Sequence, residues 1–326
     1  MSTKSEAPPT LPLLRRSVPA LPGLFLRTPN AGNYVLEFLT AQIRNPNTRK
    51  AYARAITDFG AWCAAHGISA LSLVGPVHVA AYIEELTATI APPSVKQKLA
   101  ALRMLFDYLV LHQVLVVNPA HAVRGPKYVV KKGKTPILSA DETRKLLEQI
   151  DTSTVVGLRD RALIALLVYT FARVGAAIAM RVEDVYIQGR RMWVRLHEKG
   201  GKEHTMPAHH KLEYYLNAYL ETAGIGTDLS GPLFRSTVGR SGELTDRQLS
   251  QPDVYRMISR RAADAGIRTR IGCHTFRATG ITEYLRNGGK LEIAQAMANH
   301  ESARTTGLYD RREDQISLDE VERILI

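Results

Sequence analysis

Two histidines, an arginine and a tyrosine within residues 271–312 have the types and spacing to act on a phosphodiester. His274 and Arg277 are three residues apart, so a helix would place both side chains on one face. A guanidinium forks onto two phosphate oxygens, while an imidazole moves protons near neutral pH. Tyr309 follows His300 by nine positions, and its hydroxyl can serve as a covalent nucleophile. The segment therefore predicts one part of a phosphoryl-transfer site.

The charge of the chain indicates a polyanionic partner. Its 326 residues include 43 Lys plus Arg and 31 Asp plus Glu, a formal net charge of +12. Nucleic acid is the first candidate. A membrane partner is not expected, because no apolar run approaches the roughly 20 residues of a span, and we expect no secretory signal. Cys63 and Cys273 show no CxxC spacing, as expected of a reduced cytoplasmic, nucleoid-associated protein.

The first half of the chain predicts a tail followed by a helical bundle. Residues 1–30 are rich in Pro, Ser, Thr and Leu and lack a helical period, which indicates a flexible tail. From Asn33 to Asn118, apolar residues recur every three or four positions, which is typical of amphipathic helices. Asn47 or Thr48 can cap the first of these. The expected helices bury Tyr52, Ile56, Phe59 and Cys63, then cover Val77–Leu86, then bury Val95, Leu99, Leu102, Phe106 and Leu109.

The second half follows a lysine-rich linker, residues 127–136, and combines helices with a small sheet. Ser139 and Glu142 have the spacing of a capping box. Two alternating runs joined by Gln188-Gly-Arg predict an antiparallel hairpin with tight Gly turns. The expected elements are an apolar helix over 159–171, strands at 185–187 and 192–196, a helix over 250–263 and a helix stop at 288–289. The predicted fold class is mainly α with a small antiparallel β-sheet.

Four segments carry a resemblance to a known family. RDRALIALLVYTFARVGAAIAMRVEDV, LHEKGGKEHTMP, HTFR and ANHESARTTGLY resemble, in order, the active-site boxes of the tyrosine recombinase (phage integrase) family. Each side chain alone has an ordinary structural explanation, but the ordered set does not. The matching positions are Arg173, Lys199, His274, Arg277, His300 and Tyr309, with Lys202 as the alternative to Lys199.

The resemblance implies a domain organisation and also shows departures. Residues 31–126 resemble the family's helical, SAM-like core-binding domain, and residues 137–326 resemble its mixed α/β catalytic domain; together they would clamp DNA. The family commonly has a glycine two residues before the first arginine and an acid three residues after it, where this chain has Phe171 and Ala176. A usual carboxylate partner is thus absent. Ala298-Asn299 replaces the common Leu-Gly before His300.

The resemblance also assigns a role to each residue. Arg173 and Arg277 would hold the non-bridging phosphate oxygens, for which a planar guanidinium suits better than an ammonium. Tyr309 would attack phosphorus and form a 3′-phosphotyrosyl bond, with His274 as a base. Lys199 would protonate the departing 5′ oxygen, because a lysine crowded by cations gives up its proton near neutral pH. His300 would donate a hydrogen bond to the phosphate. No metal or other cofactor is expected; His204, His209 and His210 fit no standard zinc spacing.

Basic residues outside the site indicate where DNA would be contacted. The candidates are Arg49, Lys50, Arg54, Lys96, Lys98, Arg103, Lys131, Lys132, Lys202, Arg256 and Arg260. The expected substrate is a double-stranded core site with inverted half-sites, and accessory DNA-bending proteins are a further class of partner. The apolar face of a terminal helix near 316–326 would dock into a neighbouring protomer of a homotetramer. That face consists of Leu318, Val321, Ile324 and Leu325.

Two other functions use nearly the same features. A type IB topoisomerase would need a similar set of catalytic side chains, although it can act as a monomer without an apolar terminal helix. A non-catalytic architectural or regulatory DNA-binding protein would keep the basic surface and lose the chemistry. The favoured hypothesis is a site-specific recombinase encoded by a bacterium, plasmid, transposon or phage. A covalent protein–DNA adduct at Tyr309 separates it from the non-catalytic alternative.

Overall fold

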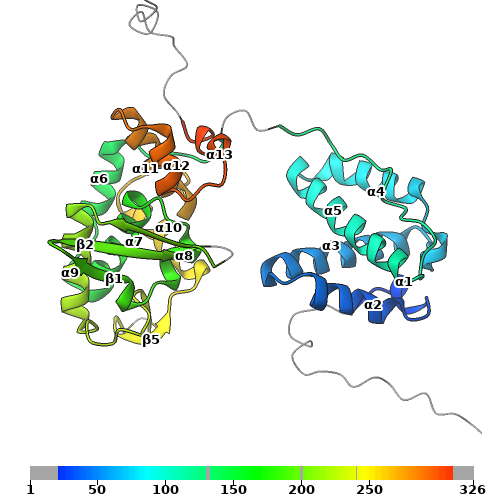
Figure 1. Cartoon of the computed structure of the whole chain (residues 1–326), viewed down its shortest axis with the longest axis horizontal. Helices are drawn as coiled ribbons and strands as arrows, with labels where there is room; N and C mark the ends of the chain where they lie inside the picture. The colour runs from blue at the N-terminus through cyan, green and yellow to red at the C-terminus, as the bar shows by residue number, and fades with distance from the viewer. Residues whose placement is uncertain (1–20, 130–132, 199–200, 240, 311–326) are drawn as a thin grey trace, which may run out of the picture. The chain divides into compact units, whose positions relative to one another are not determined.

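The computed structural model describes residues 21–129, 133–198, 201–239 and 241–310 (Figure 1). Contacts between Cα atoms divide the chain into two compact units, Met1–Val129 and Val130–Ile326. This boundary lies inside the stretch predicted as a linker. Helices predominate and the sheets are small and antiparallel, which confirms the predicted fold class. Among the described residues, none of the helices combines the length and apolarity that a bilayer crossing requires.

The N-terminal unit is a helical bundle around one apolar core. Its elements are α1 (Gly23–Leu26), α2 (Ala31–Glu37), the π-helix η1 (Phe38–Gln42), α3 (Pro46–Ala65), the 3₁₀ turn η2 (Leu71–Leu73), α4 (Pro76–Thr89) and α5 (Pro92–Leu111). The predicted stripe of α5 is fully buried, and so are Ile56, Phe59 and Cys63 of α3, whereas Tyr52 is half-buried. Helical periodicity therefore located this core correctly.

Two expectations for this unit are wrong. The predicted tail does not extend to residue 30, because Leu24 and Phe25 of α1 are 4% and 0% exposed and belong to the bundle core. Their burial offsets the entropy of ordering this segment. The cap of α3 is Asn45 rather than Asn47 or Thr48, since its side chain accepts from the backbone N–H groups of both. Pro46 then occupies the first helical position, where it needs no N–H donor.

The C-terminal unit contains the remaining elements. The helices are α6 (Ala140–Glu148), α7 (Val155–Tyr169), α8 (Val174–Ala179), η3 (Val182–Asp184), α9 (His210–Ala223), α10 (Gln251–Asp264), α11 (Cys273–Arg286), α12 (Leu291–Met297) and α13 (Ala303–Gly307). The strands are β1 (Val185–Gln188), β2 (Arg191–His197) and β3 (Glu203–Pro207), in that order in one sheet, and β4 (Arg235–Thr237) with β5 (Leu244–Gln248) in a second. Both sheets are antiparallel, as predicted for the first hairpin.

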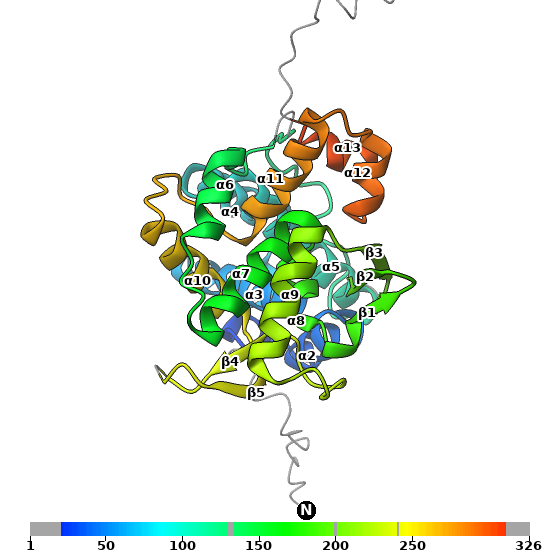
Figure 2. The ribbon, with the colours of Figure 1, turned by 90° about the vertical axis from the view of Figure 1, so that its left-hand side faces the viewer.

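Helix α7 is the centre of this unit. It begins at Val155 after the Thr154 cap, four residues before the predicted start, and it packs against α9 and α11 (Figure 2). Most of its residues are buried, as expected of a helix covered on several sides. The α11 contact is close at Gly280, where a Cβ would lie 2.2 Å from the Val168 carbonyl oxygen. Glycine at this position therefore sets the spacing between the helix that ends near Arg173 and the helix that carries His274.

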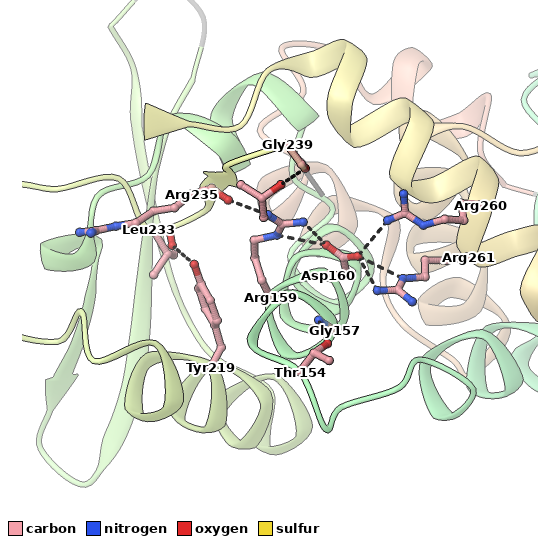
Figure 3. A network of polar contacts seen from close by, with 11 residues as sticks. Thr154, Gly157, Arg159, Asp160, Tyr219, Leu233, Arg235, Gly239, Arg260 and Arg261 are labelled. Atoms are coloured by element: carbon pink, nitrogen blue, oxygen red, sulfur yellow. Dashed lines mark hydrogen bonds and ion pairs between the residues drawn. The ribbon is translucent and has the colours of Figure 1, made fainter. Parts of the chain in front are cut away.

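A buried carboxylate joins α7 to α10. Asp160 is 0% exposed and pairs with Arg159 on one side and Arg261 on the other, at 2.7 and 2.8 Å (Figure 3). Arg159 also donates to the backbone oxygen of Arg235 at the start of β4. A buried charge is retained only with such a full set of partners. The network fixes α10 and the second sheet against the central helix.

Candidate active site

Tyr309 is hydrogen-bonded to helix α11 through both its side-chain hydroxyl and its backbone carbonyl. Its hydroxyl oxygen is 2.6 Å from Nε2 of His274, and its backbone oxygen accepts a 2.7 Å hydrogen bond from the Thr282 hydroxyl. Tyr309 is 9% exposed and belongs to a small apolar cluster that is separate from the main core. The HTFR box folds as predicted into the first turn of α11, after Gly272. The hydroxyl is thus held beside an imidazole, as a nucleophile and its base require.

Arg277 is buried one turn further along the same helix. It is 1% exposed, and its guanidinium donates through Nη1 to the Phe171 carbonyl and through Nη2 to the Ala298 carbonyl. Its Nε is buried and has no hydrogen-bond partner among the described residues. Desolvation, together with the charge of Arg173, lowers the pKa of Arg277 to about 10, so it stays charged at neutral pH. One donor of this cation is thus left without a partner in the described part of the chain.

Both carbonyls that hold Arg277 belong to unusual backbone. Phe171 has a φ of 54°, and Asn299, which follows Ala298, has a φ of 46°. Non-glycine residues rarely adopt this left-handed conformation, and a bulky one such as Phe least of all. These are two positions where the resembled family commonly has glycine. The chain therefore keeps the left-handed turns although it lacks the residue that favours them.

Arg173 lies just before α8 and has a carboxylate partner that was not predicted from the sequence. Its Nη1 is 2.6 Å from a carboxylate oxygen of Glu198, which follows strand β2. The Glu198 side chain is 4% exposed and that of Arg173 is 42% exposed. The usual acid is absent at Ala176, as predicted, and Glu198 from another element supplies the carboxylate in its place. The sequence signal that was missed is an acid directly before the hairpin lysine.

These groups line one pocket and influence each other's charge. A pocket of about 490 Å³ is bounded by Arg173, Ala176, Glu198 and His274, among others. Although His274 keeps an exposed edge, desolvation and the charges of Arg277 and Arg173 lower its pKa. The same causes lower the pKa of His300 to about 4. Both histidines are therefore neutral at pH 7, so His274 can accept a proton.

His300 is buried beneath the tyrosine. It is 8% exposed, its Nδ1 is 2.9 Å from the Thr306 hydroxyl, and its ring is nearly parallel to that of Tyr309 at 5.7 Å between centroids. The structure thus brings His274, Arg277, His300 and Tyr309 together, with Arg173 at the same pocket. Lys199 lies outside the described residues. Within the described ranges, no three His, Cys, Asp or Glu side chains gather in a way that would hold a metal ion.

The basic candidates of the N-terminal unit divide into two groups. Arg49 donates to the Ile43 carbonyl, and Arg103 donates to the Ala120 and Val123 carbonyls, so both have structural partners. Lys50, Arg54 and Lys98 instead line a shared pocket of about 790 Å³ among α3, α4 and α5. Lys98 pairs there with Asp58, while Lys50, Arg54 and Lys96 are exposed.

The candidates of the C-terminal unit are exposed and lightly paired. Arg256 and Arg260 lie one turn apart on α10, where Arg256 pairs with Asp253. Arg260 lies 3.6 Å from Asp160 (Figure 3). Lys202 pairs with Glu301 at 2.9 Å. The remaining predicted residues lie outside the described ranges: Lys131, Lys132 and the terminal helix with Leu318, Val321, Ile324 and Leu325.

Comparison with known proteins places this chain in a class. The tyrosine recombinase XerC of Pelobacter propionicus is 29% identical over 292 residues, covering 89% of this chain and 91% of XerC. A solved XerH site-specific recombinase in a pre-cleavage complex with its difH substrate has a TM-score of 0.67 at 18% identity, covering 94% and 98% of the two chains. A lambda integrase tetramer bound to a Holliday junction has a TM-score of 0.66 at 19% identity, covering 88% and 80%. The class is that of the tyrosine-type site-specific recombinases.

Family profiles make the assignment specific. The phage integrase family profile matches residues 136–315, and the profile of its N-terminal SAM-like domain matches residues 33–114. The chain belongs to the phage integrase family. The two matched ranges fall in different compact units of the structure.

Proposed function

We propose that this chain cleaves and rejoins DNA strands at a specific site through a covalent 3′-phosphotyrosyl intermediate on Tyr309. The observation that carries the proposal is the 2.6 Å approach of the Tyr309 hydroxyl to His274 Nε2, beside two arginines. A neutral imidazole with its proton on Nδ1 accepts the phenol proton at Nε2. No other described tyrosine combines such a partner with a cationic pocket.

The proposed step balances atoms and charge without a cofactor. The Tyr309 oxygen gives its proton to His274 and bonds to phosphorus, while the bond from phosphorus to the 5′ oxygen breaks. That oxygen takes a proton from Lys199, and the 3′ phosphate remains on the tyrosine. The reverse attack by a 5′ hydroxyl rejoins a strand. Arg173 and the unpartnered Nε of Arg277 would offset the charge that builds on the non-bridging oxygens.

The test is trapping of the covalent intermediate. Duplex fragments that the protein captures from sheared genomic DNA supply the substrate, which is nicked near the cleavage point so that the released strand diffuses away. We expect an SDS-resistant adduct with the wild-type chain and none with Tyr309→Phe, while both bind the intact duplex equally. A wild-type chain that captures DNA but never forms the adduct would instead be the non-catalytic DNA-binding protein.

We propose that DNA is held by exposed basic residues of both units, which would clamp it. The exposed residues of this set are Lys50, Arg54, Lys96, Arg256 and Arg260. Lys131 and Lys132 of the proposed linker lie outside the described residues and are further candidates from the sequence. Binding should weaken steeply with salt, because each neutralised phosphate releases condensed counterions. Arg256→Gln should lower the slope of log K against log[salt] by about 1, as one lost phosphate contact predicts. An unchanged slope would remove Arg256 from the set.

We further propose that four copies act together on two duplexes, with the segment 316–326 docking between protomers. The likeness to a lambda integrase tetramer on a Holliday junction supports this. Deletion of residues 316–326 should abolish strand exchange and tetramer formation on DNA while leaving cleavage of a single nicked duplex. A deletion variant that still exchanges strands would favour a different interface. A wild-type chain that only relaxes supercoils as a monomer would be a type IB topoisomerase.

A further inference from the structure

Glu198 is an unexpected group in a pocket that is otherwise cationic. Its side chain is 4% exposed, and it contacts Arg173 at 2.6 Å. A carboxylate at this place repels an incoming phosphate and is costly to bury. Its occurrence in a phosphate pocket therefore calls for a benefit that outweighs both effects.

The backbone of the hairpin does not supply that benefit. Strands β2 and β3 pair in register from Trp193 to His197, and the Glu198 N–H closes the pairing with a 2.8 Å bond to the Lys202 oxygen. These bonds would form with any side chain at 198. The carboxylate is therefore not needed to build the hairpin, and it accepts a hydrogen bond from Arg173.

The neighbouring helix explains why Arg173 needs an acceptor from elsewhere. Ala176 lies in the first turn of α8, three residues after Arg173, and lines the same pocket. Its methyl group cannot accept a hydrogen bond, and the Arg173 side chain is 42% exposed. A long side chain with this much freedom loses its aim unless a fixed acceptor holds it. Glu198 uses one of five N–H donors of the guanidinium and leaves the others for a ligand.

We propose that Glu198 is a positioning residue that aims the Arg173 guanidinium at the scissile phosphate, in place of a carboxylate at position 176. This inference rests on the proposed function and deepens it. The carboxylate reaches Arg173 from the hairpin rather than from the arginine's own helix. The aim of Arg173 is thereby tied to the placement of β2.

The experiment measures binding and cleavage separately on the nicked duplex that the wild-type chain captures. Glu198→Ala should bind DNA as tightly as the wild type or more tightly, because a repulsive charge is gone. Its single-turnover cleavage at saturating DNA should be roughly 10- to 100-fold slower, as a misaimed cation predicts. Glu198→Gln retains the shape and an acceptor oxygen, so its cleavage should be intermediate. Adding Ala176→Asp to Glu198→Ala should restore part of the rate.

Glu203 provides a matched control for Glu198. Glu203→Ala removes a carboxylate of the same hairpin that is 60% exposed and faces His197 rather than Arg173, so its cleavage rate should not change. If Glu198→Ala and Glu198→Gln both cleave at the wild-type rate, Glu198 does not position Arg173. If their loss lies wholly in DNA affinity, the inference is equally wrong. Absence of an adduct even with the wild type would instead contradict the proposed function.

Discussion

The two arginines of the site are held in opposite ways. Arg277 is 1% exposed and donates to two backbone carbonyls, which are neutral. Arg173 is partly exposed and donates to the carboxylate of Glu198, which offsets its charge. Among the described residues, no carboxylate pairs directly with the buried cation, whereas the exposed cation has a counterion within 2.6 Å.

This difference teaches which arginine sets the electrostatics of the pocket and which one can adapt to a ligand. Arg277 is the largest single charge among the causes, after desolvation, that lower the pKa values of His274 and His300. Arg277 is also fixed by the protein fold. Arg173 can change its aim with a small movement of one carboxylate. We expect structural and catalytic effects to separate between the two positions.

The same substitution at both arginines should give the largest contrast. Arg277→Lys leaves at least one buried carbonyl without a donor, which costs roughly 2–4 kcal/mol of unfolding free energy. Arg173→Lys keeps a cation beside Glu198 and should cost less than about 1 kcal/mol. Both should lower cleavage at least 100-fold. Urea denaturation followed by Trp193 fluorescence in a Trp62→Phe background reports the C-terminal unit alone. Equal losses of stability would break the comparison.

Gly280→Ala tests the fixed side without touching an arginine. The new methyl group would lie 2.2 Å from the Val168 oxygen and 2.7 Å from the Phe171 ring, so α11 must move away from α7. We expect a loss of about 1–3 kcal/mol, as for other overpacked cores, and slower cleavage. Gly307→Ala is the matched control, because its Cβ would meet nothing within 4 Å. Similar melting temperatures for the two variants would contradict the close α7–α11 contact.

The pH dependence of stability tests the burial of His300 in this cationic surrounding. The pKa of His300 falls from 6.5 to about 4 on folding, so below pH 6.5 the unfolded chain binds a proton that the native chain does not. The free energy of unfolding is therefore unaffected by this titration above pH 6.5, and it decreases from pH 6.5 towards pH 4 by at most about 1.4 kcal/mol per pH unit. His300→Gln should remove this slope between pH 6.5 and 4. His121→Gln, an exposed histidine of the other unit, should not.

The smallest effect should come from the exposed ion pair between Lys202 and Glu301. Lys202 on the hairpin pairs with Glu301 beside His300, and both are more than half exposed. Such a pair contributes about 0–1 kcal/mol, so Lys202→Met should change stability and cleavage little. Lys199→Met should instead slow cleavage strongly if Lys199 is the general acid. A larger cleavage defect in Lys202→Met would reverse that assignment.

Local patterns in the sequence predicted most elements of this fold. The apolar stripe of α5, the Ser139–Glu142 capping box and the Gly189 hairpin follow from periodicity, capping and turn chemistry, which depend on near neighbours. The cap of α3 was predicted two or three residues late. Pro46 at the first helical position was the local signal that favours Asn45.

Contacts between distant segments could not be predicted in this way. The Arg173–Glu198 pair joins residues 25 positions apart, and its formation depends on how α8 packs against β2. The missing acid at Ala176 is visible in the sequence, but no local pattern places the acid at 198 beside Arg173. The left-handed turns at Phe171 and Asn299 could not be predicted for a related reason. Neither residue type favours this conformation, so tertiary contacts must stabilise it.

The left-handed backbone at Phe171 connects the two arginines, because Arg277 donates to the Phe171 carbonyl and Arg173 is two residues further along the chain. A phenylalanine in this conformation is strained by about 1–2 kcal/mol, and its carbonyl oxygen accepts a hydrogen bond from Arg277. Arg173 follows two residues later on the same short segment. A substitution that removes the Arg277 donor from this carbonyl would release the segment, and the released segment would move Arg173 with it. The two arginines would then be coupled through this segment, so in a double-mutant cycle the effects of substituting Arg173 and Arg277 on the cleavage rate would not be additive.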